Sequence, residues 1–169
     1  MTKKLTRAQI IATIEIAHRC GELPDLSQLD LNQINLRGLD LRNVNLRGAD
    51  LSHADLGGAD LRGAWLSHAC LYSTNLRGAD LRGVDLDHAD LVKANLAGAD
   101  LRGVILTNTL VTDTDFTGAN LNGATVEQVV YALTTDKLNS PPKNNGTVAQ
   151  SSHFNPLNPV LSIETTQTC

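Results

Sequence analysis

Charged side chains that could bind a partner recur in this sequence at an interval of 20 residues. Four arginines follow one another at this interval, each two positions after an aspartate. They are Arg42, Arg62, Arg82 and Arg102, after Asp40, Asp60, Asp80 and Asp100. A row of planar guanidinium groups could bind an acidic partner. The preferred interpretation is a solvated face whose opposite charges neutralise each other, because exposed ion pairs are common and weak.

The histidines and cysteines do not form a convincing catalytic or metal site. His68 and His88 are also 20 residues apart, but zinc normally takes three or four protein ligands. The three cysteines, Cys20, Cys70 and Cys169, are odd in number and scattered, so they suggest neither a disulfide framework nor metal-ligand spacing. A reducing cytoplasm is the simplest setting, and we expect no cofactor. The sequence contains no nucleophile–base set and no phosphate-binding loop, so we expect no enzyme activity.

A five-residue repeat must position these side chains. Leucine occupies every fifth position from Leu26 to Leu106, seventeen times without a break, and Val111, Phe116 and Leu121 continue the register. A small or aliphatic residue stands two places before each of these positions, aspartate or asparagine usually stands one place before, and glycine often stands two places after.

This period excludes a regular helix or a flat strand, because either would point the leucines in several directions. If the chain instead turns by about 90° in each pentad, the leucines share one axis and four pentads close a coil stacked at the roughly 4.8 Å strand spacing. The sequence therefore predicts an all-β solenoid, a four-sided parallel β-helix of about five coils. Asp or Asn would bind free backbone N–H groups, and glycine would supply the left-handed corner.

The run Ala49-Asp50-Leu51-Ser52-His53 and the pentads that follow it resemble the A(D/N)LXX motif of the pentapeptide repeat family. The resemblance covers about residues 24–125 and implies a right-handed quadrilateral β-helix. The departures are Trp65, Cys70, Ile105 and Leu110 at the Asp/Asn position, and Thr74, Thr109 and Thr114 at the small inner position.

Both ends of such a rod require covering segments. Thr6 and Gln9 form a capping box, so residues 1–23 should hold a capping helix over 6–20 that ends at Gly21. Thr125 and Gln128 form a second capping box, which predicts a short helix over 126–137. Residues 138–169 are rich in Asn, Ser, Thr and Pro and are expected to be a disordered tail.

The departures from the Asp/Asn pattern also line up at multiples of 20. Trp65 and Ile105 share one column, Cys70 and Leu110 the next, and Tyr72 and Val92 stack beside them. Together they predict an apolar patch across one edge of the rod, and exposed apolar patches usually mark interaction surfaces. The alternative is that the C-terminal segment folds back over this patch.

These features predict a non-enzymatic scaffold that binds an unidentified protein in the cytoplasm. The net charge of −4 gives no strong attraction to nucleic acid or an anionic membrane, and no apolar stretch is long enough to span a bilayer. The family resemblance adds two alternatives: a DNA-mimic inhibitor of a type II topoisomerase (DNA gyrase), and a regulator of cyanobacterial cell differentiation. It also implies a monomer or a weak dimer formed through the C-terminal helix.

Overall fold

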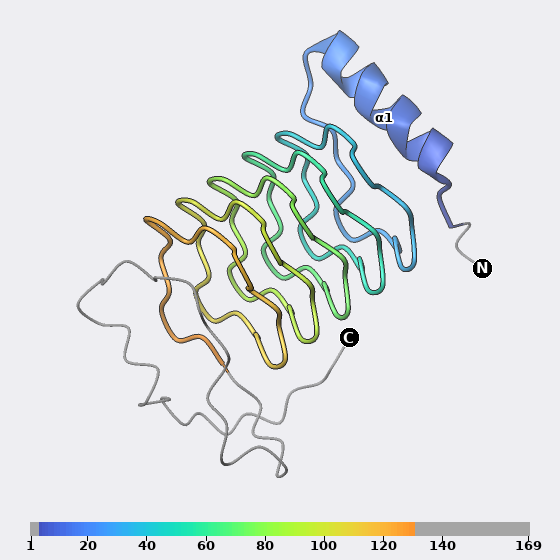
Figure 1. Cartoon of the computed structure of the whole chain (residues 1–169). Helices are drawn as coiled ribbons and strands as arrows, with labels where there is room; N and C mark the ends of the chain where they lie inside the picture. Colours follow the sequence, from blue (N-terminus) through green and yellow to red (C-terminus); the bar gives the residue numbers. More distant parts are fainter. Residues whose placement is uncertain (1–3, 131–169) are drawn as a thin grey trace.

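The chain winds into a four-sided rod. The computed structural model describes residues 4–130 (Figure 1). All of its backbone bridges are parallel, involve single residues, and join positions 20 apart, from Asp25↔Asn45 to Leu110↔Val130. No longer strand occurs in residues 4–130, because a turn interrupts the extended backbone in every pentad. The predicted solenoid and its 20-residue coil are confirmed.

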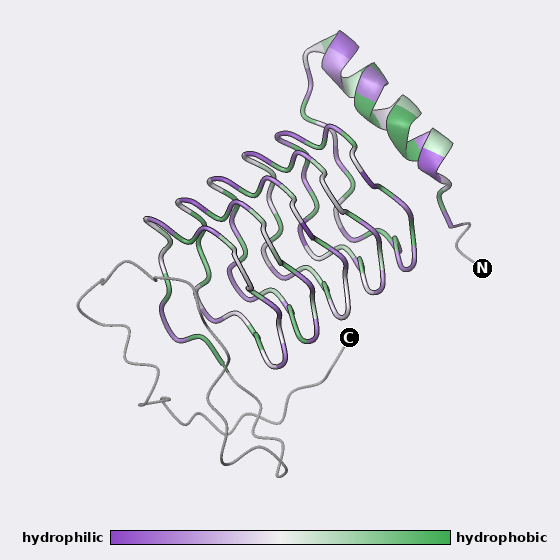
Figure 2. Cartoon of the chain, viewed as in Figure 1, coloured by the Kyte–Doolittle hydropathy of each residue, from purple (hydrophilic) through white to green (hydrophobic). Residues whose placement is uncertain are grey.

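The leucines fill the interior of the rod. The leucines at every fifth position from Leu26 to Leu101 are at most 1% exposed, and most residues two places earlier, such as Ala49 and Val84, are also buried. Along each coil, hydrophobic and hydrophilic residues alternate at short intervals (Figure 2). Each buried leucine contributes roughly 1.5–3 kcal/mol through the apolar surface that it removes from water.

Every pentad turns at a residue with a positive φ. Eleven non-glycine residues adopt this left-handed conformation, among them His68 at φ 60° and Asn108 at φ 54°. Gln28 and Lys93, whose types are less suited to this conformation, adopt it as well, at 58° and 60°. Bonds to the neighbouring coil therefore impose the corner even where the residue type does not favour it.

The Asp and Asn side chains bind the turn that follows them. Asp25 Oδ1 accepts the N–H of Ser27 at 2.9 Å, and Asp55 Oδ1 accepts that of Gly57 at 3.0 Å. This geometry repeats through the rod and satisfies N–H groups that the bridges leave free. The predicted role of this position is confirmed.

Three threonines replace the small inner residue without leaving an unsatisfied hydroxyl. Thr74, Thr109 and Thr114 donate to carbonyl oxygens 23 residues earlier, at 2.7, 2.9 and 2.7 Å. Within the described residues, every buried side-chain nitrogen or oxygen has a hydrogen-bond partner.

Helix α1 (Arg7–Cys20) lies across the first coil (Figure 1). It begins with the predicted capping box of Thr6 and Gln9 and ends at Gly21 in the left-handed conformation. Ile10 and Ile14, at 0% and 7% exposure, join the hydrophobic core. Arg7 fixes the helix by donating to the carbonyl oxygens of residues 35 and 37, at 2.7 and 3.1 Å.

The predicted second helix does not begin at residue 126. Residues 126–130 continue the repeat, because Asn108 N–H donates to Glu127 and Val130 forms a parallel bridge with Leu110. The Thr125–Gln128 pattern is therefore part of a pentad, with Gln128 at a corner φ of 51°. The rest of that predicted helix, 131–137, and the predicted tail, 138–169, lie outside the described residues.

The stacking assigns each outward residue to one of four sides. Side A comprises residues 25–28, 45–48, 65–68, 85–88, 105–108 and 125–128. Side B comprises 30–33, 50–53, 70–73, 90–93 and 110–113. Side C comprises 35–38, 55–58, 75–78, 95–98 and 115–118. Side D comprises 40–43, 60–63, 80–83, 100–103 and 120–123.

Candidate functional site

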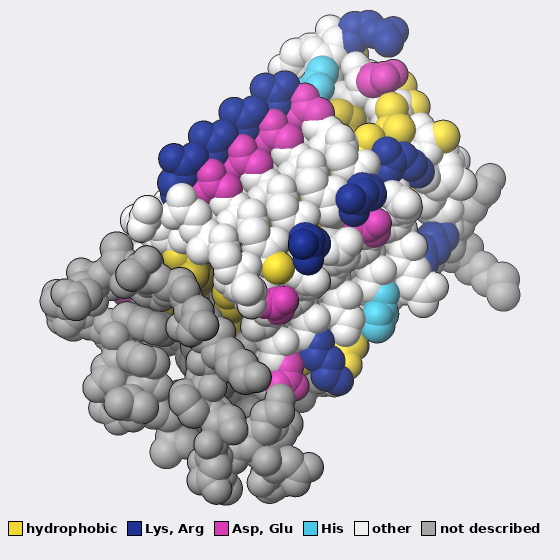
Figure 3. All heavy atoms as spheres, viewed as in Figure 1, with side chains coloured by type: hydrophobic (Ala, Val, Ile, Leu, Met, Phe, Trp, Pro, Cys, Tyr) yellow, Lys and Arg dark blue, Asp and Glu magenta, His cyan; other side chains and the backbone are white. Residues whose placement is uncertain are grey.

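Side D carries a continuous ladder of ion pairs. Each of the four arginines binds the aspartate two residues earlier, with Nη2 to Oδ2 distances of 2.6–2.7 Å and Nε to Oδ1 distances of 2.8–2.9 Å. Three of them also reach the aspartate of the next coil at 3.6–3.7 Å. Figure 3 shows the result as two parallel rows of opposite charge. The members are Arg42, Arg62, Arg82 and Arg102 with Asp40, Asp60, Asp80 and Asp100.

The ladder already occupies the Nε and Nη2 edge of each of these guanidinium groups. The bidentate bonds from the guanidinium groups lower the pKa of all four aspartates, and hydrogen bonds to the carboxylates raise the pKa of the arginines. An acidic partner would have to compete with these intramolecular carboxylates. The geometry thus favours a mutually neutralised face.

Side A exposes two large apolar side chains at positions where the repeat usually places Asp or Asn. Trp65 is 37% exposed and Ile105 is 40% exposed, and within residues 4–130 the other large exposed hydrophobic residues are Ile16 and Leu23. Asp85 lies between Trp65 and Ile105 in the same column. The guanidinium carbon of Arg47 lies 5.4 Å from the centre of the Trp65 ring, which is within cation–π range.

Side B contributes less apolar surface than the sequence predicts. Cys70 is only 5% exposed, and its Sγ lies 2.9 Å from Ser52 Oγ, so it takes no part in an exposed patch. Tyr72, Val92 and Leu110 are half-buried. The corner column that contains His68 separates these residues from Trp65. The structure therefore divides the predicted patch into two groups on different sides.

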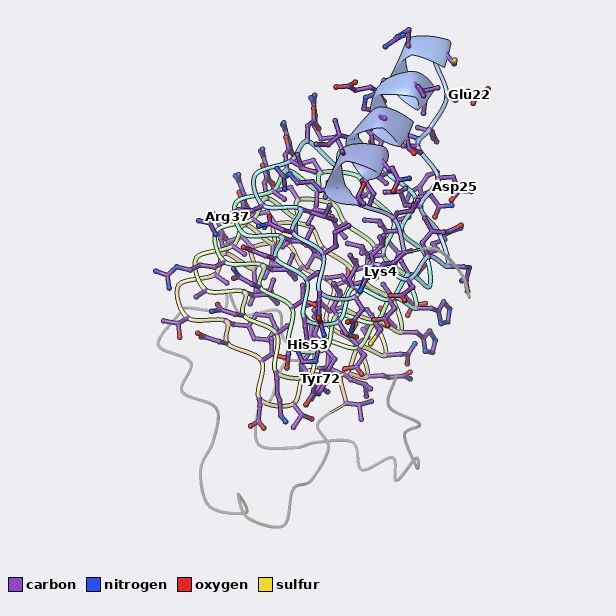
Figure 4. The ribbon with its side chains drawn as sticks, turned by 90° about the vertical axis from the view of Figure 1, so that its right-hand side faces the viewer. Lys4, Glu22, Asp25, Arg37, His53 and Tyr72 are labelled. Carbon is purple, nitrogen blue, oxygen red and sulfur yellow. The ribbon has the colours of Figure 1, made fainter. Side chains whose placement is uncertain are left out.

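Tyr72 forms a polar cluster on side B. Lys93 Nζ donates to Tyr72 Oη at 2.9 Å and lies 5.3 Å from the centre of its ring. The His53 ring meets Tyr72 edge-on at 5.5 Å, and Figure 4 shows the two side chains close together. The hydrogen bond that Lys93 donates to Tyr72 raises the pKa of Lys93. This cluster gives Tyr72 a positively charged neighbour on the adjacent coil.

His68 and His88 stack at the corner between sides A and B. Their ring centroids lie 4.9 Å apart with an interplanar angle of 3°, and His88 Nε2 lies 3.2 Å from Asn108 Nδ2. Both are corner residues with positive φ, as expected. Within the part of the chain that the structure describes, no group of three His, Cys, Asp or Glu residues could hold a metal ion.

Sequence reasoning missed three of the side chains that shape these surfaces. Arg47 covers part of Trp65, and His53 and Lys93 contact Tyr72. The 20-residue register contains the signal for all of them, because each lies 18 to 21 positions from the aromatic residue that it contacts. The register places two residues on adjacent coils, but it does not give the direction of a long side chain.

The chain matches the model of the pentapeptide repeats, in eight copies, over residues 25–63, 69–108 and 94–130. One similar solved structure is the pentapeptide repeat protein Rfr23 from the cyanobacterium Cyanothece 51142. It is 36% identical, with 61% of this chain and 64% of that chain covered and a TM-score of 0.39.

Two further similar structures come from the cyanobacterium Nostoc PCC 7120. HetL, a pentapeptide repeat protein involved in heterocyst differentiation regulation, is 33% identical over 65% of this chain and 50% of its own, with a TM-score of 0.36. The pentapeptide repeat protein alr5209 is 32% identical over 78% of this chain and 84% of its own, with a TM-score of 0.26.

The chain thus spans about two thirds of the length of Rfr23 and half that of HetL. A search of curated proteins gave no match. Among the described residues, no helix combines the length and the apolar character needed to cross a bilayer.

Proposed function

Since the chain belongs to the pentapeptide repeat family, its rod is a right-handed β-helical solenoid, and we propose that it is a non-enzymatic scaffold that binds a protein through side A. Trp65 and Ile105 are the anchors of this surface. Members of the family are generally scaffolds of this kind, and side A is the side on which large apolar residues are exposed.

The observation that carries this proposal is the loss of a local hydrogen bond at each anchor. In most other pentads, Asp or Asn accepts the backbone N–H two residues later. Trp65 and Ile105 cannot accept such a bond and expose apolar surface to water instead. The cation–π contact of Arg47 with Trp65 leaves much of the ring exposed, and a partner that buries both apolar side chains explains these changes best.

The remaining predicted binding residues have a smaller part in this proposal. Tyr72, Val92 and Leu110 on side B would extend the contact, although they are half-buried. The arginines of side D would contribute through electrostatic attraction at the margin, because their carboxylate partners offset most of their charge.

We also infer the number of coils, the role of helix α1 and the cellular compartment. The bridges between residues 25 and 130 support a rod of about five coils, and α1 would act as its N-terminal cap because it buries Ile10 and Ile14. The free thiols of Cys20 and Cys70 support action in a reducing compartment such as the cytoplasm.

The test exchanges both anchors for the residue type that the repeat prefers. The double variant Trp65→Asp/Ile105→Asp should lose capture of the partner from a lysate of the source cells. The matched control, Asn95→Asp/Asn120→Asp, adds the same two charges at the same repeat position on sides C and D. It should capture the partner as the wild-type protein does. Circular dichroism and thermal unfolding establish that both variants are folded.

Retained capture by the folded Trp65→Asp/Ile105→Asp variant would exclude side A as the binding surface. Capture lost equally in both variants would point to a general effect of negative charge. Mass spectrometry identifies the captured protein and separates a foreign partner from copies of the chain itself.

The alternative of DNA mimicry has less support from the surface charges. The repeat region, 24–123, carries 13 Asp against 7 Arg and 1 Lys. On side D the carboxylates are paired with arginines, which does not resemble a continuous row of phosphates. A supercoiling assay with gyrase tests this alternative, and inhibition at micromolar protein would support it. A role in cyanobacterial differentiation stays a prediction from family resemblance.

A further inference from the structure

When side A is reversed end to end, its outward residues become complementary to those of side A in the original direction. The side can be divided into rungs, one for each coil: rung 1 is 25–28, rung 2 is 45–48, rung 3 is 65–68, rung 4 is 85–88 and rung 5 is 105–108. Rung 3 carries Trp65 at the centre. Arg47 lies on rung 2, and Asp85 and Asp87 lie on rung 4.

We propose that side A binds side A of a second copy of this chain, with the two rods antiparallel and a two-fold axis at Trp65. This inference rests on the proposed function, because it uses the same surface and names its partner. In a two-fold interface, residue i of one copy contacts residue j of the other and the reverse. With the axis at rung 3, rung 2 faces rung 4 and rung 1 faces rung 5.

Charge complementarity is the first argument for this arrangement. Arg47 would face Asp87 of the second copy, because both occupy the position after the central leucine, and the pair would occur twice. Asn45 would face Asp85 of the second copy in the neighbouring column. A parallel arrangement, with the axis along the rods, would instead place Asp85 against Asp87 of the second copy. Like charges in contact disfavour that arrangement.

Apolar matching is the second argument. Trp65 would lie against Trp65 of the second copy at the axis, where tryptophan often dominates binding energy. Ile105 on rung 5 would face Asp25 on rung 1, because both occupy the position before the inner leucine. The apolar part of this contact therefore comes mainly from Trp65 at the axis, while Ile105 lies at the end of the interface.

The contact is small, so the dimer should be weak. Four spacings of roughly 4.8 Å separate rung 1 from rung 5, which gives a contact about 20 Å long. Interfaces smaller than about 1,200 Å² are typical of transient complexes. We therefore expect a reversible monomer–dimer equilibrium that shifts with concentration in the micromolar range, measured by sedimentation velocity on the full chain.

A charge exchange tests the pairing. Arg47→Asp alone would place like charges at both Arg47–Asp87 contacts, and so would Asp87→Arg alone, so each variant should weaken self-association at least about tenfold, or 1.4 kcal/mol. In a mixture of the two variants, each contact again joins opposite charges. The mixture should therefore dimerise as the wild-type protein does, which a structural effect of either substitution would not produce. Arg77→Asp on side C, at the same repeat position as Arg47, is the control and should leave self-association unchanged.

The outcomes separate this inference from the proposed function. A wild-type chain that stays monomeric up to several hundred micromolar overturns the dimer, and so does a mixture that fails to re-associate. In either case, the lysate experiment with the Trp65 and Ile105 variants still decides whether side A binds a foreign protein. Dimerisation that survives Trp65→Asp also overturns the inference, because it places the contact elsewhere.

Discussion

Sides A and D are built from the same pentad, yet they present opposite surfaces. Side D repeats Asp-Leu-Arg from coil to coil, and its charges pair within the molecule. Side A changes at every rung and exposes Trp65 and Ile105. Beneath both sides, the leucines are equally buried. The fold is thus kept where the residue before the leucine is not Asp or Asn, so this position can carry function at some rungs.

The largest expected effect tests whether the two sides share one core. Leu61→Ala beneath side D and Leu66→Ala beneath side A should each lower the free energy of unfolding by about 2–5 kcal/mol, because both side chains are fully buried. Urea unfolding measures both losses. A much smaller loss for Leu66→Ala would mean that the irregular exterior of side A extends into its packing.

The next effect concerns the position before the leucine. Asp60→Ala on side D removes the acceptor for the N–H of Arg62 and the bidentate partner of its guanidinium, so it should destabilise the rod by about 1–2 kcal/mol. Asp60→Asn keeps an acceptor oxygen and should cost less. Equal losses in the two variants would show that the ion pair, and not the backbone bond, matters at this position.

Trp65→Asp on side A should change the free energy of unfolding less than Asp60→Ala does. It supplies an acceptor that could bind the N–H of Ser67, as in the regular pentads, and it removes a side chain that is partly exposed. We expect a change in unfolding free energy within about 1 kcal/mol of zero. Thermal unfolding measures it, and a loss above about 3 kcal/mol would show that Trp65 is a structural residue in the rod.

Acid should weaken the ion-pair ladder of side D. The pKa values of Asp40, Asp60, Asp80 and Asp100 lie below the usual 3.8 in the folded rod, mainly because the arginines donate hydrogen bonds to their carboxylates. This stabilisation is present above the unfolded-state pKa and is lost as the pH falls through the lowered values. Stability below about pH 4 should therefore fall more steeply in the wild-type protein than in a variant with all four changed to Asn. Equal slopes would contradict this.

The smallest expected effect on stability comes from a substitution that extends the ion-pair ladder of side D. Asn120 occupies the next position in the column of side D aspartates. Asn120→Asp would place a carboxylate on the coil that follows Arg102. The other three ladder arginines already have such a carboxylate on the following coil. The expected gain is a few tenths of a kcal/mol, and high salt should remove it because exposed pairs are screened. A gain that persists in 1 M salt would not be electrostatic.

The sequence predicted the features that depend on the period alone. The leucine core, the turns at residues such as His68 and Asn108, and the capping box at Thr6 follow from residue type and register. At residues 125–128, the Thr–Gln pattern is compatible both with the start of a helix and with one more pentad. The pentad forms because the preceding coil offers bonding partners: Leu106 donates to Thr125 and Val111 to Val130.

The candidate site was only partly predictable, because exposure depends on neighbours in adjacent coils. Trp65 and Ile105 are exposed as predicted. Cys70 is small enough to lie buried beside Ser52, and Tyr72 is flanked by His53 and Lys93. The direction of Arg47 toward Trp65 required coordinates, since a long side chain at that position can adopt several rotamers.

The bridges at intervals of 20 residues have a consequence for changes in chain length. Removal of one whole coil between Trp65 and Ile105 would halve their separation and leave both on side A. Removal of a single pentad would turn everything beyond it by a quarter circle, moving Ile105 to side D while leaving a leucine at every inner position. Insertions and deletions in multiples of five could therefore rearrange the outer surface of this rod without disturbing its interior.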